Sequence, residues 1–169
     1  MPEVHHRILI PVTPEEAWDF IADVRNAPHW MFGVKEVAGS LSPPLRPGDR
    51  LNIRLVAGGK LADSEWVIGA CERPSLVSSR GHAMGASAQL RILCRPVGPS
   101  STEVTQELSY QLPGGALGYL AARFGVSGIL DVQAHRSLQA LAQQLDRSGD
   151  RPSRALPAEE IGGGGARSG

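Results

Sequence analysis

The sequence has no excess of charge of either sign, which argues against a nucleic-acid-binding protein and against a protein held on anionic membranes by basic residues. Its 169 residues carry 17 Lys plus Arg and 17 Asp plus Glu, so the formal net charge is zero. Nucleic-acid binders usually carry a basic excess that neutralises phosphates, and proteins held on anionic membranes carry polybasic clusters. No apolar run approaches the roughly 20 residues of a transmembrane helix. We therefore expect no nucleic-acid partner and no membrane span.

Cysteine and histidine are also scarce, which argues against a framework of disulfides and against a metal-binding site. Cys71 and Cys94 are too few for a disulfide framework and too isolated for a zinc site, so we expect reduced structural thiols. His5 and His6 are adjacent, and adjacent strand residues point to opposite faces, so they cannot chelate one metal ion. The N-terminus lacks the basic start and apolar stretch of a signal peptide. We expect no metal, no cofactor and a cytoplasmic location.

The first 31 residues predict a strand followed by two helices. Alternating apolar positions over residues 4–11 indicate a strand. Thr13 can cap a helix, Pro14 suits its first position, and Glu16 completes a capping box. A second short helix is expected over residues 26–31.

Residues 34–110 have the pattern of an antiparallel sheet. Strands are predicted at 34–38, 51–55, 66–72, 76–81, 88–95 and 104–110, where apolar and polar residues largely alternate. The segments between them are short and rich in Gly, Pro and Ser. Closely spaced strands of this kind form an antiparallel sheet with one solvated face and one covered face.

One long helix is predicted over residues 116–146, and it is the only long element left to cover the sheet. Counted at 100° per residue, one side of this helix gathers Leu117, Leu120, Phe124, Leu138, Ala142 and Leu145. Gly125 and Gly128 each cost about 1 kcal/mol relative to Ala and mark a kink or a close backbone approach. Residues 1–147 are therefore expected to form one domain, and residues 148–169, rich in Gly and Pro, a disordered tail.

A curved sheet around one helix encloses more volume than the helix fills, unless large side chains occupy the rest. The chain has only eight aromatic residues, three Trp, two Tyr and three Phe, or 5% of its length. We therefore expect an internal cavity.

Several segments resemble the polyketide cyclase/dehydrase and lipid-transport group of the START-related helix-grip superfamily, known as SRPBCC. They are RILIPVTPEEAWDFIAD at 7–23, NAPHWMFGV at 26–34, PGDR at 47–50, STEVTQEL at 101–108 and LGYL at 117–120. The resemblance spans residues 4–145. It implies an α+β helix-grip fold: a curved antiparallel sheet of about seven strands around a long C-terminal helix, with two short helices after the first strand. Members include aromatase/cyclases, lipid and quinone carriers and hormone receptors, and they share no catalytic residue.

The side chains expected to line the cavity come from the apolar strand faces and from the long helix. They are Trp66, Ile68, Leu90, Gln106, Leu108, Tyr110, Phe124, Ser127, Asp131, His135 and Leu138. Gln106 and Tyr110 would supply polar groups within an apolar pocket, the usual composition of a small-molecule site. Each could instead be satisfied by backbone near the end of the sheet. Trp30 is expected to pack the short helices onto the sheet.

Asp131 and His135 are the weak candidates for catalysis. They lie four residues apart and are therefore neighbours on a helix. If the helix continues unbroken through Gly128, both residues fall on the side that faces the sheet. A carboxylate that orients an imidazole there suits general acid–base chemistry. A kink at Gly125 or Gly128 would turn the two residues into a surface ion pair.

The sequence leaves three functions open. The first is binding or carrying of a small hydrophobic molecule such as a lipid, a quinone or a polyketide-like compound. The second is a polyketide cyclase or dehydratase that uses polar cavity residues for proton transfer, and the third is a non-enzymatic interaction module. The sequence does not decide whether the protein is an enzyme, but the lack of a recognisable catalytic set favours the first function. A weak homodimer is left open.

Overall fold

The computed structural model of the chain describes residues 2–39, 42–57, 59–83, 85–116, 118 and 125–149. Seven strands and a long C-terminal helix dominate these residues. The elements are β1 Glu3–Ile10, α1 Pro14–Ala22, the 3-10 helix η1 Val24–Asn26, α2 Ala27–Trp30, β2 Val34–Gly39, β3 Arg50–Ala57, β4 Lys60–Glu72, β5 Leu76–Ala83, β6 Ala86–Pro96, β7 Thr102–Gln111 and α4 Val126–Gly149. The strand, short-helix, sheet and long-helix order predicted from the sequence is confirmed.

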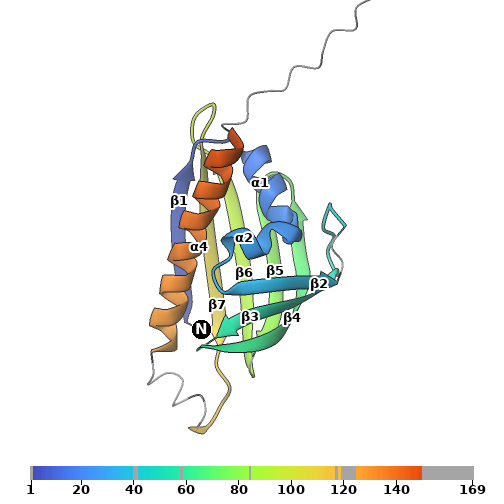
Figure 1. Cartoon of the computed structure of the whole chain (residues 1–169), viewed down its shortest axis with the longest axis vertical. Coiled ribbons are helices and arrows are strands. Elements are labelled where there is room, and N and C mark those ends of the chain that lie inside the picture. Colours follow the sequence, from blue (N-terminus) through green and yellow to red (C-terminus); the bar gives the residue numbers. More distant parts are fainter. Residues whose placement is uncertain are drawn as a thin grey trace, which may run out of the picture.

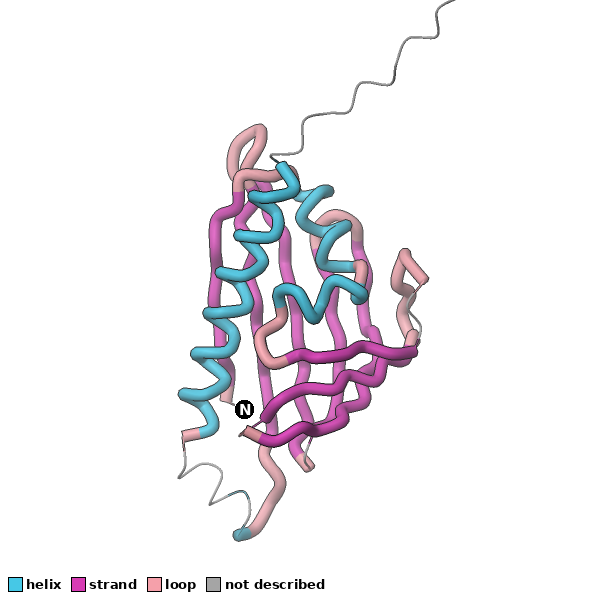
Figure 2. Tube along the Cα trace, viewed as in Figure 1, coloured by secondary structure: helices cyan, strands magenta, loops and turns pink. Residues whose placement is uncertain are grey.

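The strands form a single antiparallel sheet in the order β1-β7-β6-β5-β4-β3-β2. Strands β2 to β4 turn away from the direction of β5 to β7, so the sheet curls (Figure 1). A register shift between Ile68 and Cys71 lies in the β4–β5 pair, and bulges of this kind bend and twist a strand. The helices lie on the concave side of the sheet (Figure 2). This is the helix-grip arrangement that the sequence resemblance implied.

Helix α1 begins as the sequence predicts. The Thr13 hydroxyl accepts a hydrogen bond from the Glu16 backbone N–H at 3.3 Å, and the Glu16 carboxylate accepts one from the Thr13 N–H at 2.9 Å. Its apolar face carries Trp18, whose indole N–H donates to the carbonyl of Leu76 on β5 at 3.1 Å. The next residue, Asp19, is exposed. Helix α1 therefore covers the end of the sheet formed by β5 and β6.

Helix α4 does not begin where the sequence predicted. Gly125 has a φ of +73°, and the helix starts at the next residue, so it is not a continuous helix from residue 116. Leu138, Leu141 and Leu145 are buried on its inner face, and the helix packs on β1 and α2. It ends at Gly149, two residues past the expected domain boundary. Residues 117, 119–124 and 150–169, which include most of the expected tail, lie outside the described residues.

The rest of the core agrees with the expected roles of Trp30 and the two cysteines. Trp30 is 2% exposed and packs in the main hydrophobic cluster with α1 and the sheet. Both thiols are free, and burial raises the pKa of Cys94 to about 12. Within the described part of the chain, no helix combines the length and apolar character needed to cross a bilayer.

Candidate functional site

A cavity of about 490 Å³ lies between the concave face of the sheet and the first half of α4. Its wall is formed by β3, β4, β6, β7, the turn after α2, the start of β2, the segment after β7 and the inner face of α4. The lining residues are Met31, Phe32, Val34, Leu55, Val56, Trp66, Ala86, Ala88, Leu90, Gln106, Leu108, Tyr110, Leu112, Pro113, Val126, Ile129, Leu130, Gln133, Ala134 and Ser137. Most of them are apolar. The cavity expected from the low aromatic content is therefore present.

A second, smaller cavity of about 100 Å³ adjoins the first beneath the short helices. Five residues line both spaces: Met31, Val34, Leu55, Trp66 and Leu90. These five residues therefore form the wall that the two cavities share.

The indole of Trp66 is fixed at this shared wall by two neighbours. Its Nε1–H donates a hydrogen bond to the Ser64 hydroxyl at 2.5 Å, so the ring presents carbon atoms to the cavity. Gly81 lies opposite Trp66 in the β4–β5 ladder, and a Cβ atom at Gly81 would overlap the indole ring. Glycine at position 81 is therefore what lets the ring lie flat over β5.

Two polar side chains enter the cavity from the same face of β7. Gln106 and Tyr110 are each 5% exposed. The Gln106 Oε1 atom is buried and has no hydrogen-bond partner among the described residues. The backbone N–H of Tyr110 donates to the Pro2 carbonyl at 3.1 Å, which ties this end of β7 to the start of the chain. The Gln106 Oε1 atom is therefore available to a guest.

The rim of the cavity is held together by α4 and the turn that follows α2. The Ser137 hydroxyl accepts a hydrogen bond from the Phe32 N–H at 2.8 Å and donates one to the Gln133 carbonyl at 2.7 Å. The Arg136 guanidinium lies 5.0 Å from the centre of the Phe32 ring. A cation over an aromatic face attracts the ring, so this contact also holds Phe32 at the rim.

The described lining contains no Asp, Glu, Lys, Arg or His. On the convex face of the sheet, charged side chains form pairs such as Arg91–Glu107 and Arg95–Glu103, each at 2.8 Å. Among the described residues, no group of His, Cys, Asp and Glu is arranged to hold a metal ion. The cavity is therefore an uncharged apolar space with a few neutral polar groups.

The structure brings together about half of the residues that the sequence singled out. Trp66, Leu90, Gln106, Leu108 and Tyr110 line the main cavity, and Ile68 lines the smaller one. Leu138 is buried in the core without lining either space. Ser127 is exposed, and Phe124 lies outside the described residues.

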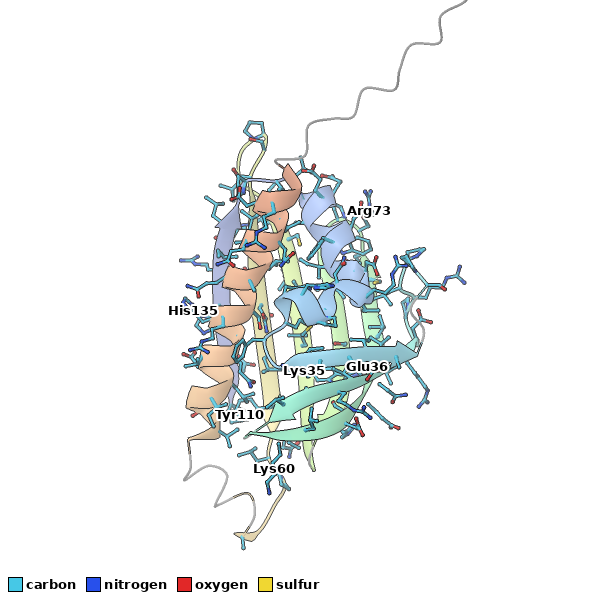
Figure 3. The ribbon with its side chains drawn as sticks, in the orientation of Figure 1. Lys35, Glu36, Lys60, Arg73, Tyr110 and His135 are labelled. Carbon is cyan, nitrogen blue, oxygen red and sulfur yellow. The ribbon has the colours of Figure 1, made fainter. Side chains whose placement is uncertain are left out.

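Asp131 and His135 do not face the cavity, contrary to the orientation expected for an unbroken helix and in line with the surface position expected for a break at Gly125. Asp131 accepts a hydrogen bond from His6 Nε2 on β1 at 2.8 Å, and its side chain is 59% exposed. The ring of His135 lies 5.6 Å from that of His6. Figure 3 shows His135 on the outer flank of α4, while Tyr110 lies near the beginning of that helix. The expected phase was counted from Leu117, and it does not carry across the break at Gly125.

The same shift in phase explains which residues the sequence reasoning missed. The face of α4 toward the cavity carries Val126, Leu130, Gln133, Ala134 and Ser137. Counted at 100° per residue within α4, these residues lie on one side of the helix. The rim residue Phe32 had no signal in the sequence, because its position depends on contacts between distant segments.

The family of the chain follows from its sequence as well as its fold. The family model described as polyketide cyclase/dehydrase and lipid transport matches residues 1–146, and the chain belongs to this family. No match was found among curated proteins.

Solved structures share the fold at low sequence identity. The Zhui aromatase/cyclase from Streptomyces sp. R1128 is 13% identical, with a TM-score of 0.72 over 89% of this chain and 96% of that one. A conserved protein from Geobacillus kaustophilus is 16% identical, with a TM-score of 0.71 over 87% and 97%. A START superfamily protein from Mycobacterium smegmatis is 15% identical, with a TM-score of 0.64 over 86% and 98%. These likenesses define a START-related helix-grip fold.

Proposed function

We propose that this protein binds or carries a small hydrophobic molecule in the cavity between the sheet and α4. The observation that carries the proposal is the cavity of about 490 Å³ with its apolar wall. Small-molecule sites are typically concave, of about 300–1,000 Å³, mostly apolar, and supplied with a few polar groups. Side chains that line an unfilled cavity lack dispersion partners on one side, and a fitted apolar guest supplies them.

A neutral fluorescent probe tests the proposal when it is combined with a variant that fills the cavity. We would titrate the protein with N-phenyl-1-naphthylamine, whose emission rises in apolar surroundings. Ala88→Trp places a large ring in the cavity, because Ala88 lies in its wall. Gln89→Trp is the matched control, since Gln89 is exposed and adjacent strand residues point to opposite faces.

The proposal expects saturable binding to the wild type and to Gln89→Trp, and at least about tenfold weaker binding to Ala88→Trp. Circular dichroism would establish that both variants are folded. Equal affinity of all three proteins, or no saturable binding to the wild type, would contradict binding in this cavity.

Polyketide cyclisation or dehydration is a second candidate function. It is favoured by the neutral polar groups of Gln106 and Tyr110 in the cavity and by the description of the family. Tyr110 is the only described lining residue with an ionisable side chain. In this candidate, Tyr110 rather than Asp131 or His135 would exchange a proton with a bound poly-β-ketone. Cyclised product formed by the wild type and lost in Tyr110→Phe, with binding retained, would support it.

The cytoplasmic location, the lack of a nucleic-acid partner and a weak homodimer stay predictions of the sequence. The third function that the sequence left open, an interaction module, would be favoured if deletion of residues 150–169 abolished binding to a protein partner.

A further inference from the structure

The chemical class of the guest can be inferred from one atom in the cavity wall. Gln106 is 5% exposed, and its Oε1 atom is buried without a hydrogen-bond partner among the described residues. Buried polar groups in folded proteins are nearly always hydrogen-bonded, because an unsatisfied one carries the whole cost of its desolvation. A lone unpartnered amide oxygen in the wall of a cavity is therefore suited to a donor on the guest.

Neither residue opposite Gln106 in the sheet donates a hydrogen bond to its Oε1 atom. In the sheet register, Gln106 lies opposite His6 on β1 and Ile92 on β6. Ile92 has no polar side-chain atom. The Nε2 atom of His6 is already hydrogen-bonded to Asp131 at 2.8 Å. The Oε1 acceptor of Gln106 is thus left for a molecule inside the cavity.

The absence of charge in the cavity wall also restricts the charge that the guest can carry. The described lining residues contain no ionised side chain that could pair with a charged group. An ion transferred from water into an apolar space without a partner loses its hydration and gains little in return. A carboxylate, sulfonate or phosphate would therefore be disfavoured beside Gln106.

The spacing along β7 suggests how such a guest lies. Gln106 is near the middle of β7, and Tyr110 lies four residues further along the same face, toward the end of the sheet where α4 begins (Figure 3). Four residues of a strand span about 13 Å. A guest with its donor at Gln106 can extend its apolar body between Leu90 and Leu108 toward Tyr110.

We infer that the guest is an uncharged, mostly apolar molecule whose hydroxyl or N–H group donates a hydrogen bond to Gln106. The inference rests on the proposed binding function. A hydroxyl and an N–H group are both donors that an amide oxygen can accept from.

Three probes with one skeleton test the donor and the charge separately. N-Phenyl-1-naphthylamine is neutral and carries one N–H group. Its N-methyl derivative lacks the N–H, and 1-anilinonaphthalene-8-sulfonate adds a permanent negative charge. We would measure dissociation constants of all three for the wild type, for Gln106→Leu and for Gln89→Leu, in which the same change is made at an exposed site on the convex face.

The wild type and Gln89→Leu should bind the N–H probe about 3- to 10-fold more tightly than the N-methyl probe, the usual range for one neutral hydrogen bond. In Gln106→Leu this ratio should fall to the value set by the methyl group alone. Because the ratio compares two ligands of one folded variant, a general loss of stability does not imitate the effect. The sulfonate should bind the wild type at least tenfold more weakly than the neutral N–H probe.

An unchanged ratio in Gln106→Leu would overturn the role of Gln106, and sulfonate binding as tight as that of the neutral probe would overturn the requirement for an uncharged guest. Both results are distinct from failure of the proposed function, in which none of the probes would bind saturably.

Discussion

The Ser137 hydroxyl on α4 accepts a hydrogen bond from the backbone N–H of Phe32, at a distance of 2.8 Å. The two residues are 105 positions apart in the chain, and the bond connects the long helix to the turn between α2 and β2. Because Phe32 and Ser137 both line the cavity, this bond fixes the width of its rim.

Removal of this hydroxyl should loosen the rim. In Ser137→Ala the Phe32 N–H loses its partner, and we expect the free energy of unfolding to fall by about 1–2 kcal/mol. Stopped-flow fluorescence should also show faster release of N-phenyl-1-naphthylamine. Ser127→Ala, a change at an exposed site on the same helix, is the control. Equal release rates and stabilities for the two variants would mean that the bond does not hold the rim.

The close contact between Gly81 and the Trp66 ring should appear as strong coupling between the two positions. Gly81→Ala forces the added methyl group against the indole, and overpacking of this kind costs about 1–3 kcal/mol. In a Trp66→Leu background the methyl group has room, so the same substitution should cost much less. Urea denaturation of the two single variants and the double variant measures the coupling. Additive costs would contradict the packing described for Trp66.

Substitution of Asp131 or His135 should leave the cavity unaffected. Asp131 bonds to His6 at the outer flank of α4, and neither residue lines the cavity. We expect Asp131→Asn and His135→Ala to change the dissociation constant of N-phenyl-1-naphthylamine by less than about twofold, which is under 0.5 kcal/mol. If either variant abolished binding, or abolished turnover of a poly-β-ketone by an active wild type, the orientation of α4 described above would need revision.

The ion pair between Asp19 on α1 and Arg73 in the β4–β5 turn should give a small pH dependence. Arg73 donates to the two carboxylate oxygens at 2.7 and 2.8 Å, and these hydrogen bonds hold the pKa of Asp19 below its usual value. A lowered carboxyl pKa adds stability above the unfolded-state pKa, near 3.9, and this stability disappears as pH falls through the folded-state pKa.

Both side chains are about half exposed, so Arg73→Met should cost under about 1 kcal/mol at pH 7. The difference from the wild type should shrink as the pH falls below 4. Arg80→Met is the control, because it removes the same charge from an exposed position. Thermal unfolding over pH 2–7 measures both variants, and a difference that persisted undiminished at pH 2 would contradict the assignment.

The fold could be predicted from the sequence because its main signals are local. The capping box of Thr13 and Glu16 and the two-residue alternation through Gln106 and Tyr110 depend only on neighbouring residues, and both are confirmed in the structure. The low aromatic content predicted a cavity, since few large side chains were available to fill the space. These features also placed five strand residues in the wall of the main cavity.

The helical half of the site could not be predicted in the same way. Helical phase accumulates at 100° per residue, so a count that runs through the non-helical Gly125 rotates the expected inner face. Leu138 and Leu145 still fall on the buried side, but residues at the edges of that face are misplaced. This error placed Asp131 and His135 inside and left Gln133 and Ser137 unnoticed. The rim formed by Phe32 depends on a contact across 105 residues, for which a single sequence carries no local signal.

The location of a bound guest most directly tests the claim that the protein binds a hydrophobic molecule between the sheet and α4. We would record nuclear Overhauser contacts between N-phenyl-1-naphthylamine and the methyl groups of the protein in solution. A guest held between the sheet and α4 should show contacts to Leu90 and Leu108, which line the cavity, and none to the exposed Leu9, Leu61 and Val97. Contacts confined to the exposed methyl groups, with none to Leu90 or Leu108, would contradict an internal binding site.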